Sequence, residues 1–221
     1  MLVERSIIDA IRVLGPGYLG TIAIAMELAA LVFCYLQFGL WTMVAISPFI
    51  SFFLALFLIY SVVAIKWAVM GTFKPVIKPL WCRWVWLNEM VNGLYESVFS
   101  NTVAPFLGTP FISVFLRGMG VKVGKNAYIA SILISEFDLI KIGNYASMGI
   151  GSVLQTHLFE DRVFKSSYLE IDEGTSVGNM SIVLYDTYMA PNSQLSSLSL
   201  LMKGETLAES TRWHGIPTRQ Y

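Results

Sequence analysis

The chain has 221 residues, of which 55% are hydrophobic and only 14% are charged, and its mean hydropathy is +0.62. This composition is too apolar for an ordinary soluble domain, so we expect part of the chain to lie in lipid. The 15 basic and 15 acidic residues leave a formal net charge of zero, which provides no long-range field to attract nucleic acid. Two isolated cysteines, Cys34 and Cys82, form neither a disulfide framework nor a zinc pattern, and this fits a reducing cytoplasmic environment.

Two long apolar runs in the first third of the chain predict transmembrane helices. One extends from Tyr18 to Gln37 and is broken only by Glu27, and the other extends from Phe49 to Ile65 without a charge. Each is about as long as the roughly 20 residues that a helix needs to cross a hydrocarbon layer of about 30 Å. Two buried core helices are disfavoured because too little chain remains to cover them. A signal peptide is disfavoured because the first run starts late and a second one follows at once.

The basic residues around these runs predict the orientation of the hairpin. Arg5 and Arg12 precede the first run, several basic residues follow the second, and the connection between the runs carries no charge. Both flanks, and hence the rest of the chain, are therefore expected on the cytoplasmic side of an inner or cytoplasmic membrane. Glu27 lies near the middle of its helix, where a charge is costly, so it is either a functional group or a protonated carboxyl packed against another helix.

An amphipathic segment follows, from Lys78 to Gly108. Apolar residues recur at helical spacing, and three tryptophans lie close together near its start: Trp81, Trp84 and Trp86. Tryptophan favours the headgroup layer, so this segment is expected to be an interfacial helix, a helix packed on the soluble domain, or both.

From Val123 onward the apolar residues follow a six-residue period. With two changes of register, the repeated position is always aliphatic, at Val123, Ile129, Ile142, Met148, Leu154, Ile171, Val177, Val183, Met189, Leu195 and Leu201. The next position is usually small, as at Gly143 and Gly178. Neither a coiled coil nor an amphipathic helix returns to the same face every six residues, whereas a parallel β-helix with three strands per coil does.

The predicted fold is therefore a membrane α-helical hairpin followed by an all-β parallel β-helix of about four coils. We expect a two-helix transmembrane hairpin with basic flanks over residues 1–79, and an interfacial amphipathic helix and a lead-in helix over 80–120. The β-helix domain with a C-terminal cap is expected over 121–221.

The sequence motifs of this region resemble a known family. The hexads "VGKNAYI", "IGNYASMGIGS" and "VGNMSIV", introduced by "FLRGMG" and closed by "WHGIPTR", are similar to the hexapeptide-repeat acyltransferases. The hairpin together with "SEFDLIKIGN", "LQTHLFEDRVFK" and "SLSLLMKGE" most resembles the membrane-bound C-terminal condensing domains of ε-poly-L-lysine synthetase-type nonribosomal peptide synthetases. That family carries three tandem units of this kind, and this chain matches one of them.

The resemblance implies the handedness of the coil, the reaction and the assembly. It implies a left-handed β-helix, which is an exception to the usual right-handed crossover. It implies transfer of an acyl or aminoacyl group to an amine or hydroxyl from a thioester on coenzyme A or on the phosphopantetheine arm of a carrier protein. Hexapeptide-repeat enzymes are commonly trimeric, so a single unit is expected to form a homotrimer. Because no adenylation domain or carrier motif is seen, activation of the substrate is expected to take place elsewhere.

His157, in "LQTHLFEDR", is the main catalytic candidate. The six-residue period breaks just after it, which predicts an excursion from the coil over 158–170, and loops on a rigid scaffold often carry sites. A coil of about 18 residues places His157 above Leu139 and next to Asp138, the carboxylate that we favour as its partner. His157 is then a general base, a structural histidine or a metal ligand, and the last needs more histidines than the chain has.

The other candidate residues are expected to bind substrate or the thioester donor. They include Glu160 and Asp161 as further carboxylates beside the histidine, and Glu136, Trp213, His214 and Lys203. The segment around His214 either binds the thioester arm or only caps the β-helix, and Lys203 either contacts a phosphate or is a solvated charge. Two function classes remain open: a membrane-anchored transferase, and a noncatalytic β-helix scaffold that holds synthetase partners at the membrane.

Overall fold

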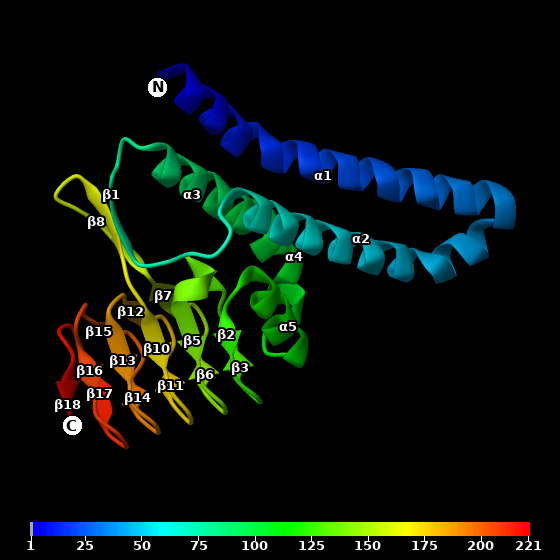
Figure 1. The fold of residues 1–221 in the computed structure, drawn as a ribbon. Helices are drawn as coiled ribbons and strands as arrows, with labels where there is room; N and C mark the ends of the chain where they lie inside the picture. The colour runs from blue at the N-terminus through cyan, green and yellow to red at the C-terminus, as the bar shows by residue number, and fades with distance from the viewer. Residues whose placement is uncertain (1) are drawn as a thin grey trace. The chain divides into compact units, whose positions relative to one another are not determined.

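The computed structural model describes residues 2–221, which divide into two compact units (Figure 1). The helical unit comprises the chain up to Val69 together with Trp86–Val103. The β-helix unit comprises Met70–Val85 together with Ala104–Tyr221. These boundaries differ from those expected at residues 79 and 120, because the segment 70–85 packs with the β-helix and most of the amphipathic helix packs with the hairpin.

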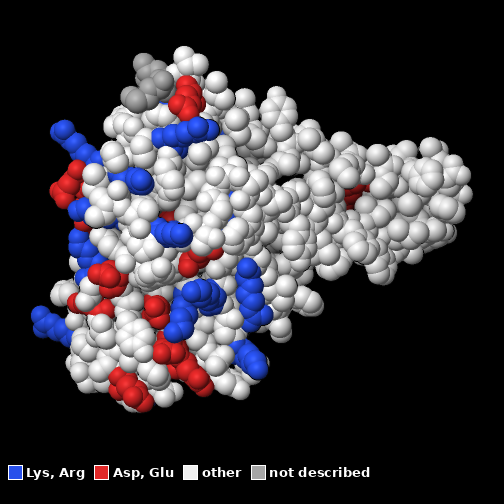
Figure 2. Space-filling view, in the orientation of Figure 1, with Lys and Arg blue, Asp and Glu red and all other residues white. Residues whose placement is uncertain are grey.

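The helical unit is built on a hairpin of two long helices, α1 (Leu2–Phe38) and α2 (Leu40–Val69). Gly39 joins them with a φ of 81°, a left-handed conformation that glycine adopts without strain. By length and composition both helices are long and apolar enough to cross a membrane, and they contain the two expected spans. On the face shown in Figure 2, the outer part of this hairpin is almost uncharged apart from one recessed acidic patch.

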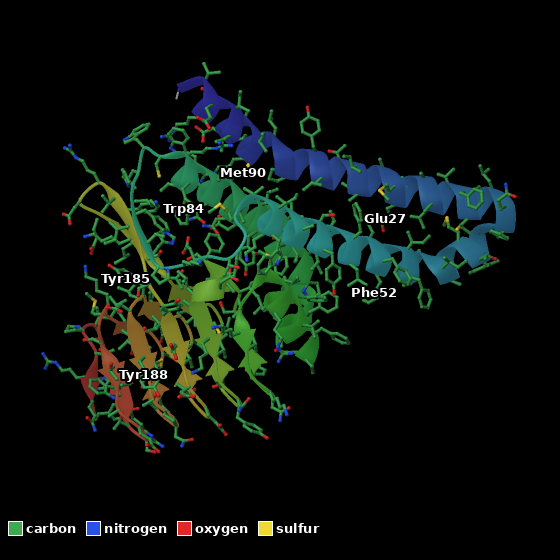
Figure 3. All side chains as sticks on the ribbon, viewed as in Figure 1. Glu27, Phe52, Trp84, Met90, Tyr185 and Tyr188 are labelled. Carbon is green, nitrogen blue, oxygen red and sulfur yellow. The ribbon has the colours of Figure 1, made fainter. Side chains whose placement is uncertain are left out.

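Glu27 is paired across the hairpin. The Ser51 hydroxyl donates a hydrogen bond of 2.5 Å to Glu27 Oε1, and Figure 3 shows Glu27 between the two helices. The structure thus gives this carboxyl a contact with the neighbouring helix, while its role stays a prediction.

The amphipathic segment forms a helix that begins at Arg83. It consists of α3 (Arg83–Leu94), a π-helical turn η1 (Tyr95–Phe99) and α4 (Ser100–Val103). Its apolar face is buried inside the helical unit, where Trp86 and Met90 cluster with Ile8. The hairpin thus covers the apolar face that was predicted to lie against the membrane interface or the soluble domain.

The β-helix unit is a three-sided coil whose strands pair in parallel from one coil to the next (Figure 1). The short helices η2 (Ala104–Phe106) and α5 (Pro110–Met119) precede it. The first face contains β2 (Lys122–Val123), β5 (Ile140–Ile142), β10 (Leu169–Ile171), β13 (Thr187–Met189) and β16 (Thr206–Leu207). The second face contains β3 (Tyr128–Ile129), β6 (Ser147–Met148), β11 (Ser176–Val177), β14 (Gln194–Leu195) and β17 (Arg212–His214), closed by the antiparallel β18 (Arg219–Gln220). The third face contains β4 (Leu133–Ile134), β7 (Val153–Gln155), β12 (Ile182–Leu184) and β15 (Leu200–Leu201). Four coils are complete, as expected, and a fifth has two faces.

The six-residue period marks the interior of this coil. Every residue at the repeated position is buried, and Leu207 continues the series in the fifth coil. The small residues that follow lie at corners where successive coils touch. A Cβ placed on Gly178, for example, would lie 2.3 Å from the backbone nitrogen of Ser197, which leaves no room for a side chain.

The excursion after Leu154 is an ordered hairpin and not an irregular loop. Strands β8 (His157–Glu160) and β9 (Val163–Ser166) pair in antiparallel fashion. A third strand, β1 (Val76–Pro79), pairs with the other edge of β9. The segment after α2 is therefore an integral part of the sheet that carries His157.

Candidate functional site

His157 opens strand β8 at the point where the chain leaves the third face. Strand β7 pairs with β4 so that Leu154 lies beside Ile134, and the two neighbouring coils are offset by 20 residues at Thr156 and Glu136. The 3-10 turn η3 (Phe137–Leu139) lengthens this coil beyond the 18 residues that we expected. As a result Glu136, and not Asp138, lies under His157.

The expectation that Asp138 partners His157 is therefore corrected by the structure. Asp138 Oδ2 accepts a hydrogen bond of 3.0 Å from the backbone N–H of Phe73, and one of its oxygens would lie 2.4 Å from a Cβ on Gly120. Asp138 thus fastens the segment after α2 to the coil, and the carboxylate that contacts the imidazole is Glu136, two residues earlier.

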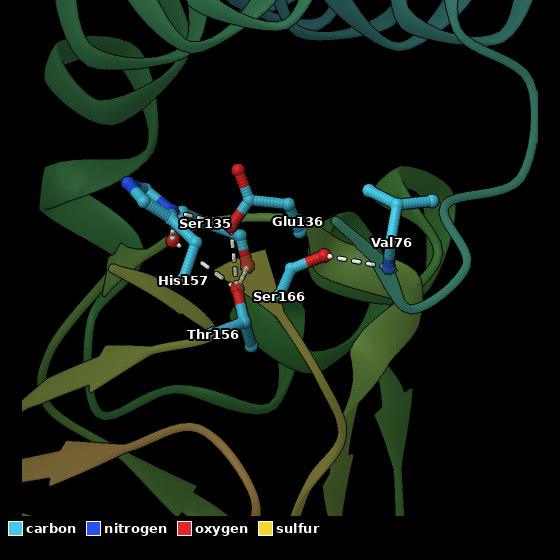
Figure 4. Close-up of polar contacts among 6 residues, drawn as sticks. All are labelled: Val76, Ser135, Glu136, Thr156, His157 and Ser166. Atoms are coloured by element: carbon cyan, nitrogen blue, oxygen red, sulfur yellow. Dashed lines mark hydrogen bonds and ion pairs between the residues drawn. The ribbon is translucent and has the colours of Figure 1, made fainter. Parts of the chain in front are cut away.

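Glu136 is a buried carboxylate that faces the imidazole (Figure 4). Its side chain has no exposed surface, and its Oε2 atom lies 2.7 Å from His157 Nδ1. The Thr156 hydroxyl lies 2.6 Å from the same oxygen and 2.8 Å from the Ser135 carbonyl, so its single proton is shared between the two acceptors. Glu136 itself adopts a left-handed backbone with a φ of 39°, a strained conformation that residues other than glycine adopt mainly at functional or tightly constrained positions.

This geometry sets the tautomer of the imidazole. A carboxylate is only an acceptor, so the proton of a neutral imidazole lies on Nδ1, and Nε2 carries the free lone pair. Nε2 lies on the opposite side of the ring from Glu136 and has no hydrogen-bond partner among residues 2–221. The side chain of His157 is 15% exposed, so this lone pair belongs to a group that solvent or a substrate can reach.

Aromatic side chains hold the imidazole plane. The ring of His157 stacks on Phe164 with centroids 4.8 Å apart and meets the edge of Phe159 at 5.1 Å. Phe164 in turn contacts Trp84 at 5.3 Å. The ring is thus fixed by a carboxylate at one edge and by packing on its face, as a positioned acid–base group requires.

Three of the predicted binding residues form one ionic network along the hairpin. Lys203 Nζ lies 2.6 and 2.7 Å from the two carboxylate oxygens of Glu160, and Lys165 lies 3.4 Å from Glu160 and 3.0 Å from Asp161. The hydrogen bond from Lys203 holds the pKa of Glu160 below its usual value, and the same contact raises the pKa of Lys203. In the structure Lys203 therefore ties the hairpin to the turn between β15 and β16.

Trp213 and His214 lie on β17, in the last coil of the second face. Trp213 Nε1 donates to Thr211 Oγ1 at 2.8 Å, and the ring of His214 meets that of Tyr221 edge to face at 4.8 Å. No contact joins either residue to His157 within the described chain. The structure thus places the two histidines in separate surroundings, and within the described residues it holds no group of three or more His, Cys, Asp or Glu side chains that would suit a metal ion.

Four parts of this site were not predicted from the sequence: Thr156, Phe164, Trp84 and the strand β1. Trp84 and β1 approach the hairpin from a distant part of the sequence, so no local pattern marks them. A usable signal existed for Glu136. Ile134 fills the third face of the first coil and fixes the offset of 20 residues, but it follows Ile129 by five positions and so escapes a strict six-residue count.

Comparison with known proteins gives one sequence relative of interest. Over 157 residues the chain is 38% identical to a delta-poly-L-ornithine synthetase of Acinetobacter baumannii (strain AB307-0294). The match covers 71% of this chain but only 12% of the relative, so this chain corresponds to a small part of that protein. No family model matches the sequence.

Solved structures with similar folds include two acetyltransferases. A maltose O-acetyltransferase from Clostridium difficile 630 is 13% identical, with 56% of this chain and 83% of that chain covered and a TM-score of 0.45. A hexapeptide-repeat acetyltransferase from Vibrio cholerae O1 biovar eltor, complexed with acetyl coenzyme A, is 10% identical, with 55% and 82% covered and a TM-score of 0.42. Likenesses of this size are too weak to bear on function, and the fold rests on the strand registers described above.

Proposed function

We propose that this chain is a membrane-anchored acyl or aminoacyl transferase in which His157 is the general base. The observation that carries the proposal is the buried Glu136 carboxylate at 2.7 Å from His157 Nδ1, which leaves Nε2 without a hydrogen-bond partner among the described residues, on a side chain that is 15% exposed. The 38% identity to part of a poly-ornithine synthetase supports an amide-forming reaction of the condensing type. The thioester donor, on coenzyme A or on a carrier protein, follows from the resemblance of the motifs to the ε-poly-L-lysine synthetase condensing domains.

The proposed reaction is a single acyl transfer. As the amine or hydroxyl of the acceptor attacks the thioester carbonyl, its proton passes to His157 Nε2 and the new C–N or C–O bond forms. The C–S bond then breaks, and the imidazolium returns the proton to the departing thiolate. Glu136 keeps the ring in the required tautomer and stabilises its positive charge while the proton is held there.

The membrane assignment rests on α1 and α2. Their length, apolarity and basic flanks support a hairpin in the cytoplasmic membrane, with both flanks and the β-helix in the cytoplasm. An engineered cysteine near Arg5 or Thr218 is then protected from an impermeant thiol reagent added to intact cells. Labelling of either position by the external reagent would show that this part of the chain lies outside the cytoplasm, opposite to the proposed orientation.

We also propose a homotrimer, which an apolar surface on the third face of the β-helix supports. The outward positions of the third face form an apolar row of Leu133, Val153, Ile182 and Leu200, in register across four coils. The outward rows of the other two faces are mostly polar. A continuous apolar row on one face of a rigid prism favours contact with a second copy of the same unit, and cyclic symmetry then closes the assembly.

The oligomer is tested by mass in detergent. We expect a trimer that Ile182→Glu dissociates, whereas Ser147→Glu, on the second face, leaves it intact. A monodisperse and active monomer of the unaltered chain would contradict this assembly.

The activity is tested on the purified full chain in detergent or lipid. Pantetheine and coenzyme A thioesters of amino acids are supplied with amine acceptors, and free thiol and amide product are measured together. We expect thiol release that depends on the acceptor and matches the amide formed. If neither forms with any donor and the protein still binds a synthetase or carrier protein, the scaffold interpretation replaces the transferase.

A further inference from the structure

The segment between α2 and α3 carries an exposed strip of basic and apolar side chains. It comprises Lys74, Ile77, Lys78 and Trp81, with Ile77 and Trp81 71% and 63% exposed. Arg162, at the turn of the β8–β9 hairpin, lies beside it because its carbonyl accepts a hydrogen bond of 3.3 Å from the Leu80 N–H. We call these five residues the basic strip, and all of them belong to the β-helix unit.

The cationic side chains of the basic strip form no ion pairs with other described residues of the protein. Lys74, Lys78 and Arg162 are exposed, and none forms an ion pair with any residue from 2 to 221. The two other lysines near this hairpin, Lys165 and Lys203, are by contrast paired with its carboxylates. The acidic groups of the hairpin are thus already neutralised. Because Ile77 and Lys78 are successive residues of β1, their side chains extend from opposite faces of the sheet, and it is the exposed edge formed by β1 that carries both uncompensated positive charge and large apolar side chains.

We infer that the basic strip binds anionic lipid headgroups at the membrane surface. Tryptophan and isoleucine that enter the interface, flanked by lysine and arginine that meet anionic phosphates, form the usual combination for contact with such a surface. Chain continuity favours a membrane over a soluble acidic partner. Lys74 follows the end of α2 at Val69 by at most about 18 Å of extended chain, so a spanning α2 delivers the first residue of the strip to the headgroup layer. The inference rests on the proposed membrane hairpin, but not on the transferase activity.

Lipid contact at this strip would act on the sheet that carries His157. Strand β1 pairs with β9 along its length, and the Val76 N–H donates to Ser166 Oγ at 3.3 Å. Ser166 is also the residue opposite His157 in the β8–β9 pair. Headgroups that hold the edge strand β1 therefore also hold β9, the middle strand of this sheet, and this links membrane composition to the order of the site.

The test uses the full chain in lipid nanodiscs, with Cys34 and Cys82 replaced by serine. A polarity-sensitive dye on Ile77→Cys reports contact through quenching by lipids that carry a spin label near the headgroup. We expect stronger quenching with about 30% anionic lipid than with zwitterionic lipid alone, and loss of the difference in high salt, because charges near a surface are screened. The same dye at Tyr221→Cys serves as the reference for a site outside the strip.

Charge-removal variants decide the cause. Each basic residue near an anionic surface contributes roughly a five-fold gain in affinity, so Lys74→Gln, Lys78→Gln and Arg162→Gln together should lower the docking equilibrium by about 100-fold. The matched variant Lys122→Gln, Lys125→Gln and Arg212→Gln removes the same charge elsewhere and should change nothing. The inference would be overturned if quenching at position 77 did not depend on anionic lipid. It would also be overturned if the two triple variants lowered the quenching equally. So would salt-sensitive binding of polyglutamate without quenching by lipid.

Discussion

Replacement of Glu136 by glutamine removes the charge under the imidazole and keeps the shape of the side chain. In the structure the Glu136 Oε2 atom lies 2.7 Å from His157 Nδ1 in a buried setting. An opposite charge about 4 Å from the centre of the imidazolium contributes about 4 kcal/mol at an effective dielectric constant near 20. Loss of that term while the ring holds a proton corresponds to a fall in kcat of about 10²- to 10³-fold. We expect KM to change little, because the charge acts on the base and not on the bound acceptor.

The neighbouring carboxylate provides the control for this substitution. Asp138→Asn is the same chemical change two residues away, and the asparagine oxygen can still accept the hydrogen bond from Phe73 N–H. We expect it to keep near-normal turnover. The assay is acceptor-dependent thiol release, with thermal unfolding measured on both variants to exclude misfolding. If Asp138→Asn loses activity while folded Glu136→Gln keeps it, the pairing of His157 with Glu136 has no catalytic meaning.

Three further predictions address other parts of the molecule. Lys203→Met should increase hydrogen exchange of the β8–β9 hairpin, because it removes the ion pair with Glu160. Acidification of the unaltered protein should have the same effect. The pKa of Glu160 is lowered in the folded state, so the stability that the ion pair contributes is present above the unfolded pKa and is lost as the pH falls through the folded pKa. Hydrogen exchange that changes with neither the substitution nor the pH would contradict a stabilising role of the Lys203–Glu160 ion pair. Gly178→Ala should destabilise the β-helix by about 1 to 3 kcal/mol, because the new Cβ would meet the backbone of Ser197, whereas Gly20→Ala meets nothing within 4 Å and should not; equal unfolding temperatures would contradict the crowding. His214→Ala should weaken donor binding or the terminal cap and leave kcat nearly unchanged, and a loss of kcat as large as that of a base variant would place the second histidine in the reaction.

The sequence predicts the coil well because burial imposes its period. Each residue at the repeated position points into a narrow interior, and the crowded corners admit only small residues, so the pattern survives without any long-range information. The two apolar helices can be predicted from the sequence for a similar reason, since length and apolarity are properties of the segments themselves.

The partner of His157 is harder to predict from the sequence, because it depends on the number of residues in one coil. The turn η3 adds residues between Ile134 and Ile140, and this moves Glu136 rather than Asp138 under the histidine. Strand β1 and Trp84 reach the hairpin by long-range contacts that leave no periodic trace. The helix α3 has an apolar face that the sequence reveals, but not the surface that covers it.

The decisive measurement for His157 as the group that takes and returns the proton in acyl transfer is the turnover of His157→Ala with a supplied thioester. Loss of a positioned general base costs about 10²- to 10⁴-fold in rate, so we expect acceptor-dependent thiol release to fall by that factor. Membrane insertion, oligomeric mass and thermal unfolding should stay nearly unchanged, because Glu136 retains the hydrogen bond from Thr156. Full turnover by the folded variant would show that His157 is not the general base, and unfolding of the variant would show that the histidine serves the structure and not the reaction.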